Sequence, residues 1–323
     1  MMIDEIAAKL NTGKKIVLMH GNADPDALGS AYALSRCFPN TEIAAPGGVD
    51  RVAKAVAEKL SITILENPQL TEYDYAVIVD CSSKDQVSAD LSGIEYVAID
   101  HHAASGDWDN CLSLCDEERK SCAEIVLDIL RHVGHKIDKT TAMALAAGMV
   151  TDSGHFKFAD SRMMRSFADL LDEAQLEMKE VISLTDLKQD VSERVSQLKG
   201  AQSMKFERVG EYIVAVAQRS SHEGSICKAL LNIGADVAFV GSQRKDEFRI
   251  SSRARQELVQ KGFHLGKILN DITGETNGVG GGHAGAAGLS GKGDAEAFLN
   301  ICVSRSLDFF RFAASEGEYQ RKR

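Results

Sequence analysis

The stretch KIVLMHGNADPDALGSAYALSRCF, residues 15–38, passes from a short apolar run through a polar turn into a helical pattern. The run at 15–20 is almost continuously apolar, as is typical of a strand that is buried on both faces. The turn that follows contains His20, Asp24 and Asp26. A strand, a polar turn and a helix in this order predict the opening of an α/β fold.

The same alternation continues through the first half of the chain. Apolar runs predict further strands at 41–46, 75–80 and 96–100, and helical patterns lie at 50–60 and 121–134. Strands of this kind, separated by helices, predict a doubly wound parallel sheet.

The second half of the chain has a different pattern. Residues 139–200 are mostly helical, and strand hairpins are expected at 205–218, with Gly210 at the turn, and at 236–254. We therefore predict an α/β protein with two domains. They are an N-terminal domain at 1–185, a linker helix at 186–204 that forms the hinge, and a smaller C-terminal α/β domain at 205–323.

The composition is typical of a soluble globular protein. The chain has 323 residues, of which 44% are hydrophobic. No apolar run approaches the roughly 20 residues of a membrane helix, and no signal-peptide pattern opens the chain. We therefore expect a cytoplasmic protein without a membrane partner. The net charge of −10 argues against a protein that grips long nucleic acid.

The cysteines indicate free thiols. There are seven of them, an odd number, which favours a reducing compartment. Cys111, Cys115 and Cys122 lie close together in the sequence, but their spacing fits no standard zinc site.

Acidic and imidazole side chains follow three of the predicted strands. They are His20, Asp24 and Asp26 after the first strand, Asp80 at the end of 75–80, and Asp100, His101 and His102 at the end of 96–100. Because ligands bind beyond the carboxyl ends of parallel strands, these groups are expected at one edge of the sheet. Asp152, at the end of an apolar helix, is a further candidate.

This set of side chains favours a metal centre. A single aspartate after a strand is often only a helix cap or a turn residue. Several carboxylates in one crevice, however, repel one another unless a cation is present. Histidines together with aspartates favour divalent transition metals over calcium. The pattern predicts two ions about 3.5–4 Å apart that share one carboxylate, with Pro25 directing Asp24 and Asp26 to one ion each.

Five segments resemble the DHH phosphoesterase superfamily. They are HGNADPDALGS (20–30), VIVDCS (77–82), AIDHH (98–102), GMVTDSGHFKF (148–158) and the late GGGHAGAAG (280–288). Their order matches the family across nearly the whole chain. In size and layout the chain is most similar to the group of bifunctional oligoribonucleases and 3′-phosphoadenosine-5′-phosphate phosphatases.

The resemblance implies two manganese ions between the domains, with magnesium or cobalt as alternatives. It implies that His20 and Asp24 bind the first ion. It implies that Asp26, His101 and Asp152 bind the second ion and that Asp80 bridges both. His102 would contact the scissile phosphate or the attacking water, and Asp100 would orient the histidine pair. The expected catalytic residues are therefore Asp80, His102 and Asp100.

The C-terminal domain is expected to hold the substrate. By resemblance, Arg253 and the glycine segment, with Gly281, Gly282 and His283, bind a terminal phosphate. The alternatives are an exposed hairpin arginine and an ordinary flexible loop. Arg255 competes with Arg253 for the same role.

Aromatic and imidazole groups follow Asp152. His155 is predicted to be a peripheral substrate contact, with an exposed loop histidine as the alternative. Phe156 or Phe158 would stack on a base, with core packing as the alternative that is favoured for Phe158. Asn22, where the chain departs from the common bacterial form of the first motif, has no assigned role.

The sequence thus predicts a two-metal phosphoesterase that acts on short oligonucleotides, on 3′-phosphoadenosine 5′-phosphate, or on both. Alternatives are a cyclic or linear dinucleotide phosphodiesterase, a RecJ-like single-strand exonuclease, and a non-catalytic nucleotide-binding module. The glycine segment argues against a family II inorganic pyrophosphatase. Exposed edge strands in the second domain are consistent with a homodimer.

Overall fold

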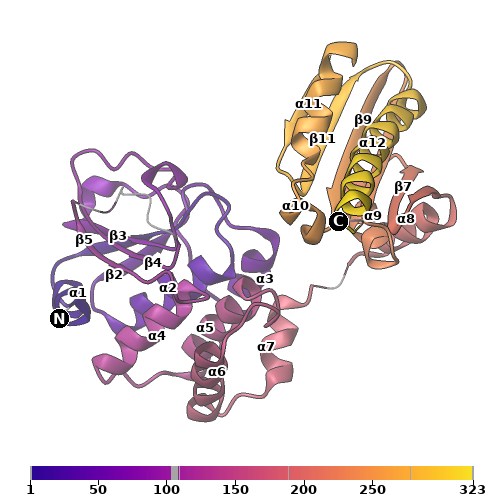
Figure 1. Cartoon of the computed structure of the whole chain (residues 1–323). Helices are drawn as coiled ribbons and strands as arrows, with labels where there is room; N and C mark the ends of the chain where they lie inside the picture. The colour runs from indigo at the N-terminus through magenta and orange to yellow at the C-terminus, as the bar shows by residue number, and fades with distance from the viewer. Residues whose placement is uncertain (1, 103–107, 109, 188, 277, 322–323) are drawn as a thin grey trace. The chain divides into compact units, whose positions relative to one another are not determined.

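The computed structural model describes residues 2–102, 108, 110–187, 189–276 and 278–321 (Figure 1). The chain forms two compact units, Met1–Lys188 and Gln189–Arg323. Each unit has its own sheet and its own hydrophobic core. The predicted α/β class is confirmed. Within the described residues, no helix has both the length and the apolar character that crossing a membrane requires.

The first unit contains a five-stranded sheet in the order β2-β1-β3-β4-β5. All its neighbouring strands are parallel. The strands are β1 (Lys15–Leu18), β2 (Thr41–Ala44), β3 (Tyr75–Val79), β4 (Glu95–Asp100) and β5 (Leu112–Cys115). Four of these strands are predicted from the sequence. The edge strand β5 is not, because its four residues are only partly buried.

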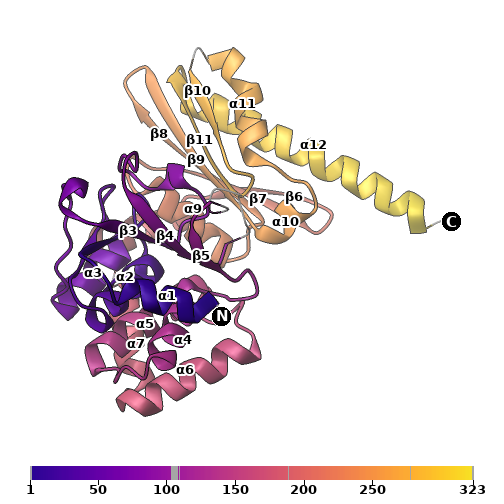
Figure 2. The same ribbon diagram turned by 90° about the vertical axis from the view of Figure 1, so that its left-hand side faces the viewer.

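Seven described helices share one hydrophobic core with one face of this sheet, which contributes side chains such as Val17, Val77 and Val97 (Figure 2). They are α1 (Met2–Leu10), α2 (Pro25–Cys37), α3 (Arg51–Leu60), α4 (Cys122–His132), α5 (Lys139–Asp152), α6 (Ser161–Ala174) and α7 (Met178–Thr185). The opposite face, with Ile16 and Ile78, is covered by irregular connections. These include the short 3₁₀ helices η1 (Leu70–Glu72) and η2 (Lys84–Gln86). The predicted parallel sheet is confirmed, although the described helices cover only one of its faces.

Helix starts in this unit follow from side-chain capping. At five helices an Asp or Ser side-chain oxygen accepts a backbone N–H of the first turn, which would otherwise lack a partner. The capping residues are Asp24, Asp50, Ser121, Asp138 and Asp160. Because each cap lies directly before its helix, it fixes the residue at which that helix begins.

The second unit contains a six-stranded mixed sheet in the order β10-β11-β9-β8-β7-β6. The strands are β6 (Lys205–Val209), β7 (Tyr212–Gln218), β8 (Val237–Arg244), β9 (Glu247–Ala254), β10 (Val279–Gly282) and β11 (Ala286–Lys292). Both predicted hairpins form, as the antiparallel pairs β6–β7 and β8–β9. Helices α10 (Gln256–Gln260), α11 (Leu265–Thr276) and α12 (Ala295–Arg321) pack on one face, and α9 (Glu223–Asn232) packs on the other.

The helix expected as a linker forms as α8 (Val191–Gln202) and is part of the second unit. It packs on α9, where an added Cβ on Gly200 would lie 2.4 Å from the Ile226 side chain. The Gln197 amide also donates to Ser225 Oγ at 2.6 Å. The boundary between the units therefore precedes this helix.

The glycine segment is a strand hairpin rather than a loop. Gly281 and Gly282 lie in β10 and pair with Gly288 and Ala287 of β11. The first turn of α11 comes so close that a Cβ on Gly266 would lie 2.0 Å from the Gly282 carbonyl oxygen. Some of the glycines therefore allow a helix and a strand to approach closely.

Candidate metal centre

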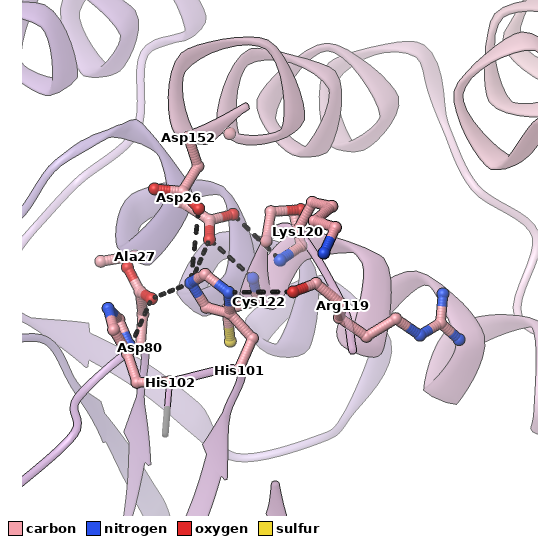
Figure 3. Close-up of polar contacts among 12 residues, drawn as sticks. Asp26, Ala27, Asp80, His101, His102, Arg119, Lys120, Cys122 and Asp152 are labelled. Carbon is pink, nitrogen blue, oxygen red and sulfur yellow. Dashed lines mark hydrogen bonds and ion pairs between the residues drawn. The ribbon is translucent and has the colours of Figure 1, made fainter. Parts of the chain in front are cut away.

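The predicted metal ligands meet at the carboxyl ends of β1, β3 and β4 and at the last residue of α5. Figure 3 shows four of them: Asp26, Asp80, His101 and Asp152. The parallel register places the ends of these three strands at one edge of the sheet. The structure therefore brings together residues that lie up to 132 positions apart, from His20 to Asp152.

A first group consists of His20, Asp24 and Asp80, whose ligand atoms lie within 4.8 Å of one another. His20 Nε2 is 4.0 Å from Asp24 Oδ1 and 3.8 Å from Asp80 Oδ2. Its other ring nitrogen, Nδ1, lies 3.1 Å from the Gly21 carbonyl oxygen. A proton on Nδ1 would leave Nε2 as the free ligand atom.

A second group consists of Asp26, His101 and Asp152. His101 Nε2 is 3.4 Å from Asp152 Oδ2 and 3.9 Å from Asp26 Oδ2. Asp26 is fully buried, and its two oxygens accept hydrogen bonds from the backbone N–H groups of Cys122 and Ala123 at 2.6 and 2.9 Å. These bonds fix the carboxylate at the beginning of α4.

Asp80 lies between the two groups. Its Oδ2 faces His20, and its Oδ1 lies 3.3 Å from His101 Nε2. The residue is 4% exposed and has a left-handed backbone with a φ of 56°. Asp80 Oδ1 and His101 Nε2 are buried and have no hydrogen-bond partner within the part of the chain that the structure describes. Buried polar atoms without partners are costly, so this arrangement fits a site that a cation completes.

The Asp-Pro-Asp turn combines two roles. Asp24 caps α2, and its Oδ1 accepts the N–H groups of Asp26 and Ala27 at 2.9 and 3.1 Å. Pro25 occupies the first helical position, where its missing N–H costs nothing. Asp24 therefore starts the helix that holds Asp26 and also remains within reach of a metal. For Asp24, capping a helix and serving as a candidate metal ligand are therefore compatible.

Asp100 and His102 lie beside these groups. His102 Nδ1 donates to Asp100 Oδ1 at 2.8 Å and lies 3.7 Å from Asp80 Oδ1. The His102 side chain is 43% exposed, whereas Asp100 is buried. The hydrogen bond to Asp100 raises the pKa of His102 to about 9. Asp100 thus orients an accessible, readily protonated imidazole.

The electrostatics of the cluster also favour a bound cation. Burial and the neighbouring Asp80 raise the pKa of Asp24, and they raise that of Asp26 well above its ordinary value. Burial raises the pKa of Asp152 to about 6, although His101 opposes this shift. For His101, burial lowers the pKa but Asp80 and Asp152 raise it by more. Mutual repulsion of this kind is what divalent cations relieve.

The metal-free protein, prepared with a chelator, is expected to lose stability as the pH rises. Folding raises the pKa of Asp24, Asp26 and Asp152. The contribution of these carboxyl groups to stability is therefore fully present when the pH is below 3.8, their pKa in the unfolded chain. It is lost as the pH passes the folded value, about 6 for Asp152. Calorimetry from pH 4 to 8 should show Asp152→Asn gaining about 1–2 kcal/mol relative to wild type at the high end. Parallel profiles for the two proteins would contradict this account.

Other predicted positions in this unit lie outside the cluster. His155 is exposed and lies in a turn with Gly154 and Phe156 in which all three residues have positive φ angles. Phe156 packs on Phe167 with ring centroids 4.8 Å apart. Phe158 is 61% exposed, so the core packing favoured for it is wrong.

Asn22 acquires a backbone role. Its φ is 60°, a left-handed conformation that asparagine tolerates better than most residues. Its N–H donates to the Gly47 carbonyl oxygen at 3.2 Å, which ties the turn of the first motif to the loop after β2. The side chain itself is exposed.

The other predicted substrate residues, Arg253, Gly281, Gly282 and His283, lie in the second unit. Arg253, the last but one residue of β9, lies beside the first turn of α9, with Nη2 3.8 Å from the position of a Cβ on Gly224. The turn that contains His283 lies at the same end of the sheet, since Arg253 pairs with Ala286. Arg255, by contrast, donates to the α9 carbonyl oxygen of Leu231 and to Ala235, so its guanidinium is already engaged.

Sequence reasoning missed several residues that shape the site. An added Cβ on Gly148 of α5 would lie 2.7 Å from Asp26 Oδ1, and one on Gly29 of α2 would lie 2.4 Å from the Ala144 carbonyl oxygen. The start of α4, whose N–H groups hold Asp26, could have been found from Ser121 and Glu124, which have the spacing of a capping box. The small residues gave no signal that they face a ligand.

Comparisons with known proteins agree with this arrangement. The sequence profile "DHH family, N-terminal domain" matches residues 14–149, and that of the DHHA1 domain matches residues 211–304. An uncharacterized protein of Methanocaldococcus jannaschii is 31% identical over 333 residues, covering 96% of this chain and 99% of that protein. The chain belongs to the DHH family. The predicted family membership is confirmed, with a DHHA1 domain in the second unit.

More distant DHH proteins indicate the chemistry of the family. The bifunctional oligoribonuclease and PAP phosphatase NrnA of Mycoplasma pneumoniae is 27% identical over 173 residues, covering 49% of this chain and 52% of that protein. A probable manganese-dependent inorganic pyrophosphatase of Streptococcus pyogenes is 26% identical over 150 residues, covering 43% and 48%. DHH proteins are metal-dependent phosphoesterases, and this chain is a DHH phosphoesterase.

A solved structure shares the whole fold. The exopolyphosphatase-related protein of Bacteroides fragilis superposes with a TM-score of 0.71, covering 96% of this chain and 97% of that chain, at 17% identity. At this identity the likeness concerns the fold alone.

Proposed function

We propose that this DHH phosphoesterase binds two manganese ions and hydrolyses short oligonucleotides and 3′-phosphoadenosine 5′-phosphate. The observation that carries the proposal is Asp80, a buried carboxylate whose two oxygens face two separate ligand groups. The relative that is an oligoribonuclease and PAP phosphatase supports this class of substrate. The net charge of −10 favours short ligands over long strands.

Each predicted ligand in the first unit has its own role in the proposed metal centre. His20 and Asp24 would hold one ion, Asp26, His101 and Asp152 would hold the other, and Asp80 would bridge them. When bound, two such ions lower the pKa of water and neutralise the charge that builds up at phosphorus. His102, held by Asp100, has Nε2 available to donate a hydrogen bond to a phosphate oxygen.

The second unit would bind the far end of the substrate. Arg253 presents a fork of donors that suits phosphate oxygens. It lies next to the first turn of α9, whose N-terminal N–H groups attract anions and where His222 provides no side-chain cap. His283 is exposed at the same end of the sheet.

A substrate panel tests the proposal. The purified protein with Mn²⁺ is given di- to pentanucleotides, a long single strand, 3′-phosphoadenosine 5′-phosphate, a cyclic dinucleotide and pyrophosphate. We expect turnover of the short oligonucleotides and of the bisphosphate. Turnover only of the long strand, the cyclic dinucleotide or pyrophosphate would overturn the proposed substrate class.

Two neighbouring arginines should respond differently to truncation. Arg253→Ala should raise KM for dinucleotides by about 10- to 100-fold with little change in the melting temperature. Its guanidinium donates one hydrogen bond, from Nη1 to the adjacent Ser252 carbonyl oxygen at 2.9 Å, and its other donors would meet a phosphate. Arg255→Ala should lower the unfolding free energy of the second unit by about 1–2 kcal/mol, because it removes two hydrogen bonds at the end of α9. Steady-state kinetics and calorimetry on both variants separate the effects. The reverse pattern would assign the phosphate contact to Arg255.

A further inference from the structure

Arg119 is a charged residue that is only 5% exposed. Its guanidinium contacts three carboxylates: Asp116 through Nε at 3.4 Å, Glu124 through Nη1 at 3.2 Å, and Asp128 through Nη2. Figure 3 shows the side chain directed away from the metal ligands. A buried charge is tolerated only when its partners are well ordered, so this network holds its backbone in place.

The backbone that carries Arg119 is tied down on both sides. Before it, the Asp116 N–H donates to the carbonyl oxygen of Asp100 at 3.0 Å, which joins the loop to the end of β4. After it, the Lys120 N–H donates to Glu124 Oε2 at 3.0 Å, which joins the loop to α4. Glu124 therefore contacts the guanidinium through one oxygen and the loop through the other.

The first consequence concerns His101. The Arg119 carbonyl oxygen lies 3.4 Å from His101 Nδ1, on the side of the ring opposite to Asp80 and Asp152 (Figure 3). This acceptor places the proton on Nδ1 and leaves Nε2 as the ligand atom. The orientation of the imidazole therefore depends on where the loop holds this carbonyl.

The second consequence concerns Asp26. Both its oxygens are held by N–H groups of Cys122 and Ala123, the first two residues of α4. Arg119 contacts Glu124 and Asp128 of the same helix, within its first two turns. The network therefore holds the start of α4 in place, and the N–H groups at this start hold Asp26.

We propose that Arg119 is a positioning residue for the second ligand group, Asp26, His101 and Asp152. It acts through its own carbonyl on His101 and through the start of α4 on Asp26. It touches neither His20 nor Asp24 of the first group. The inference rests on the metal role proposed above and is independent of which phosphoester is the substrate.

The test is isothermal calorimetry, in which Mn²⁺ is titrated into the full-length chain after a chelator has removed its metal. Wild type is compared with Arg119→Lys and Arg119→Met. We expect one of the two sites to lose about 10- to 100-fold in affinity while the other keeps its wild-type affinity. The matched control is Arg162→Met. This arginine is half exposed and lies 4.0 and 3.9 Å from Asp116 and Asp128, at the outer edge of the same network, and it should leave both sites unchanged. Equal affinities in Arg119→Met and wild type would overturn the proposal.

A second readout does not need metal. ¹⁵N NMR of the metal-free chain at alkaline pH should show His101 with its proton on Nδ1 in wild type and a mixture of tautomers in Arg119→Lys. Arg119→Lys keeps the charge, so it safeguards the test if Arg119→Met does not fold. A wild-type tautomer in a folded Arg119→Lys variant would overturn the proposal. If the wild-type chain binds no metal, the proposed function fails, while the NMR comparison still decides the role of Arg119.

Discussion

Asp80→Asn is expected to reduce hydrolysis by more than about a thousandfold and to weaken both metal sites at once. Asp80 faces both ligand groups, with Oδ2 toward His20 and Oδ1 toward His101. The amide keeps the shape of the side chain but removes its charge and one acceptor oxygen. The loss should therefore appear in kcat and in the affinity for both ions.

The effect of Asp80→Asn is measured by steady-state kinetics and by Mn²⁺ titration. Asp85→Asn is the matched control, because Asp85 is an exposed aspartate of the 3₁₀ helix that follows β3. It should leave activity and metal binding unchanged. Retention of either metal site at wild-type affinity in Asp80→Asn would show that Asp80 does not bridge.

Gly148→Ala is expected to destabilise the first unit by about 1–3 kcal/mol and to remove the second metal site. The added methyl group would lie 2.7 Å from Asp26 Oδ1, 2.9 Å from Asp26 Cα and 3.2 Å from the Pro25 carbonyl oxygen. Because α2 and α5 already touch backbone to backbone at Gly29, α2 has no room to withdraw. Asp26 would have to leave the N–H groups of α4.

Calorimetry and Mn²⁺ titration together measure this loss. The control is Gly274→Ala in α11, where no described atom beyond the neighbouring residues and backbone of its own helix lies within 4 Å of the added Cβ. That substitution should stabilise its helix by about 0.5–1 kcal/mol, because alanine favours the helical state more than glycine does. Unchanged unfolding and metal binding in Gly148→Ala would mean that the two helices separate without cost.

The sequence predicts the elements whose residues are mostly buried or strictly periodic. The runs that became β1 and β3 are almost continuously apolar because both faces of these strands are covered. The hairpin β6–β7 was signalled by Gly210, whose φ is 58°. The edge strand β5 was not predictable, because a short and partly exposed strand carries no apolar run.

The residues that form the candidate site could be predicted, but the distances between them could not. Parallel strands must end at one edge, so His20, Asp80 and His101 could be placed together from their positions alone. The cap that Asp24 forms also follows from its place before a helix. The members of the second ligand group followed from the resemblance of short motifs, but their distances depend on how α4 and α5 pack.

The surroundings of the ligands depend on distant contacts. Gly148 is required by the approach of α2, and the role of Arg119 arises from carboxylates that only the folded chain gathers. The glycine segment resembled a loop because glycines rarely favour strands, yet close packing against α11 keeps it in β10. The roles of such residues can be recognised only in the folded structure, where the packing of helices and strands is known.

A crystal structure of the chain grown with Mn²⁺, with anomalous scattering recorded at the manganese edge, tests the two-metal account most directly. We expect two peaks about 3.5–4 Å apart. One should lie among His20, Asp24 and Asp80, and the other among Asp80, Asp26, His101 and Asp152. A single peak, or two peaks without Asp80 between them, would contradict the account.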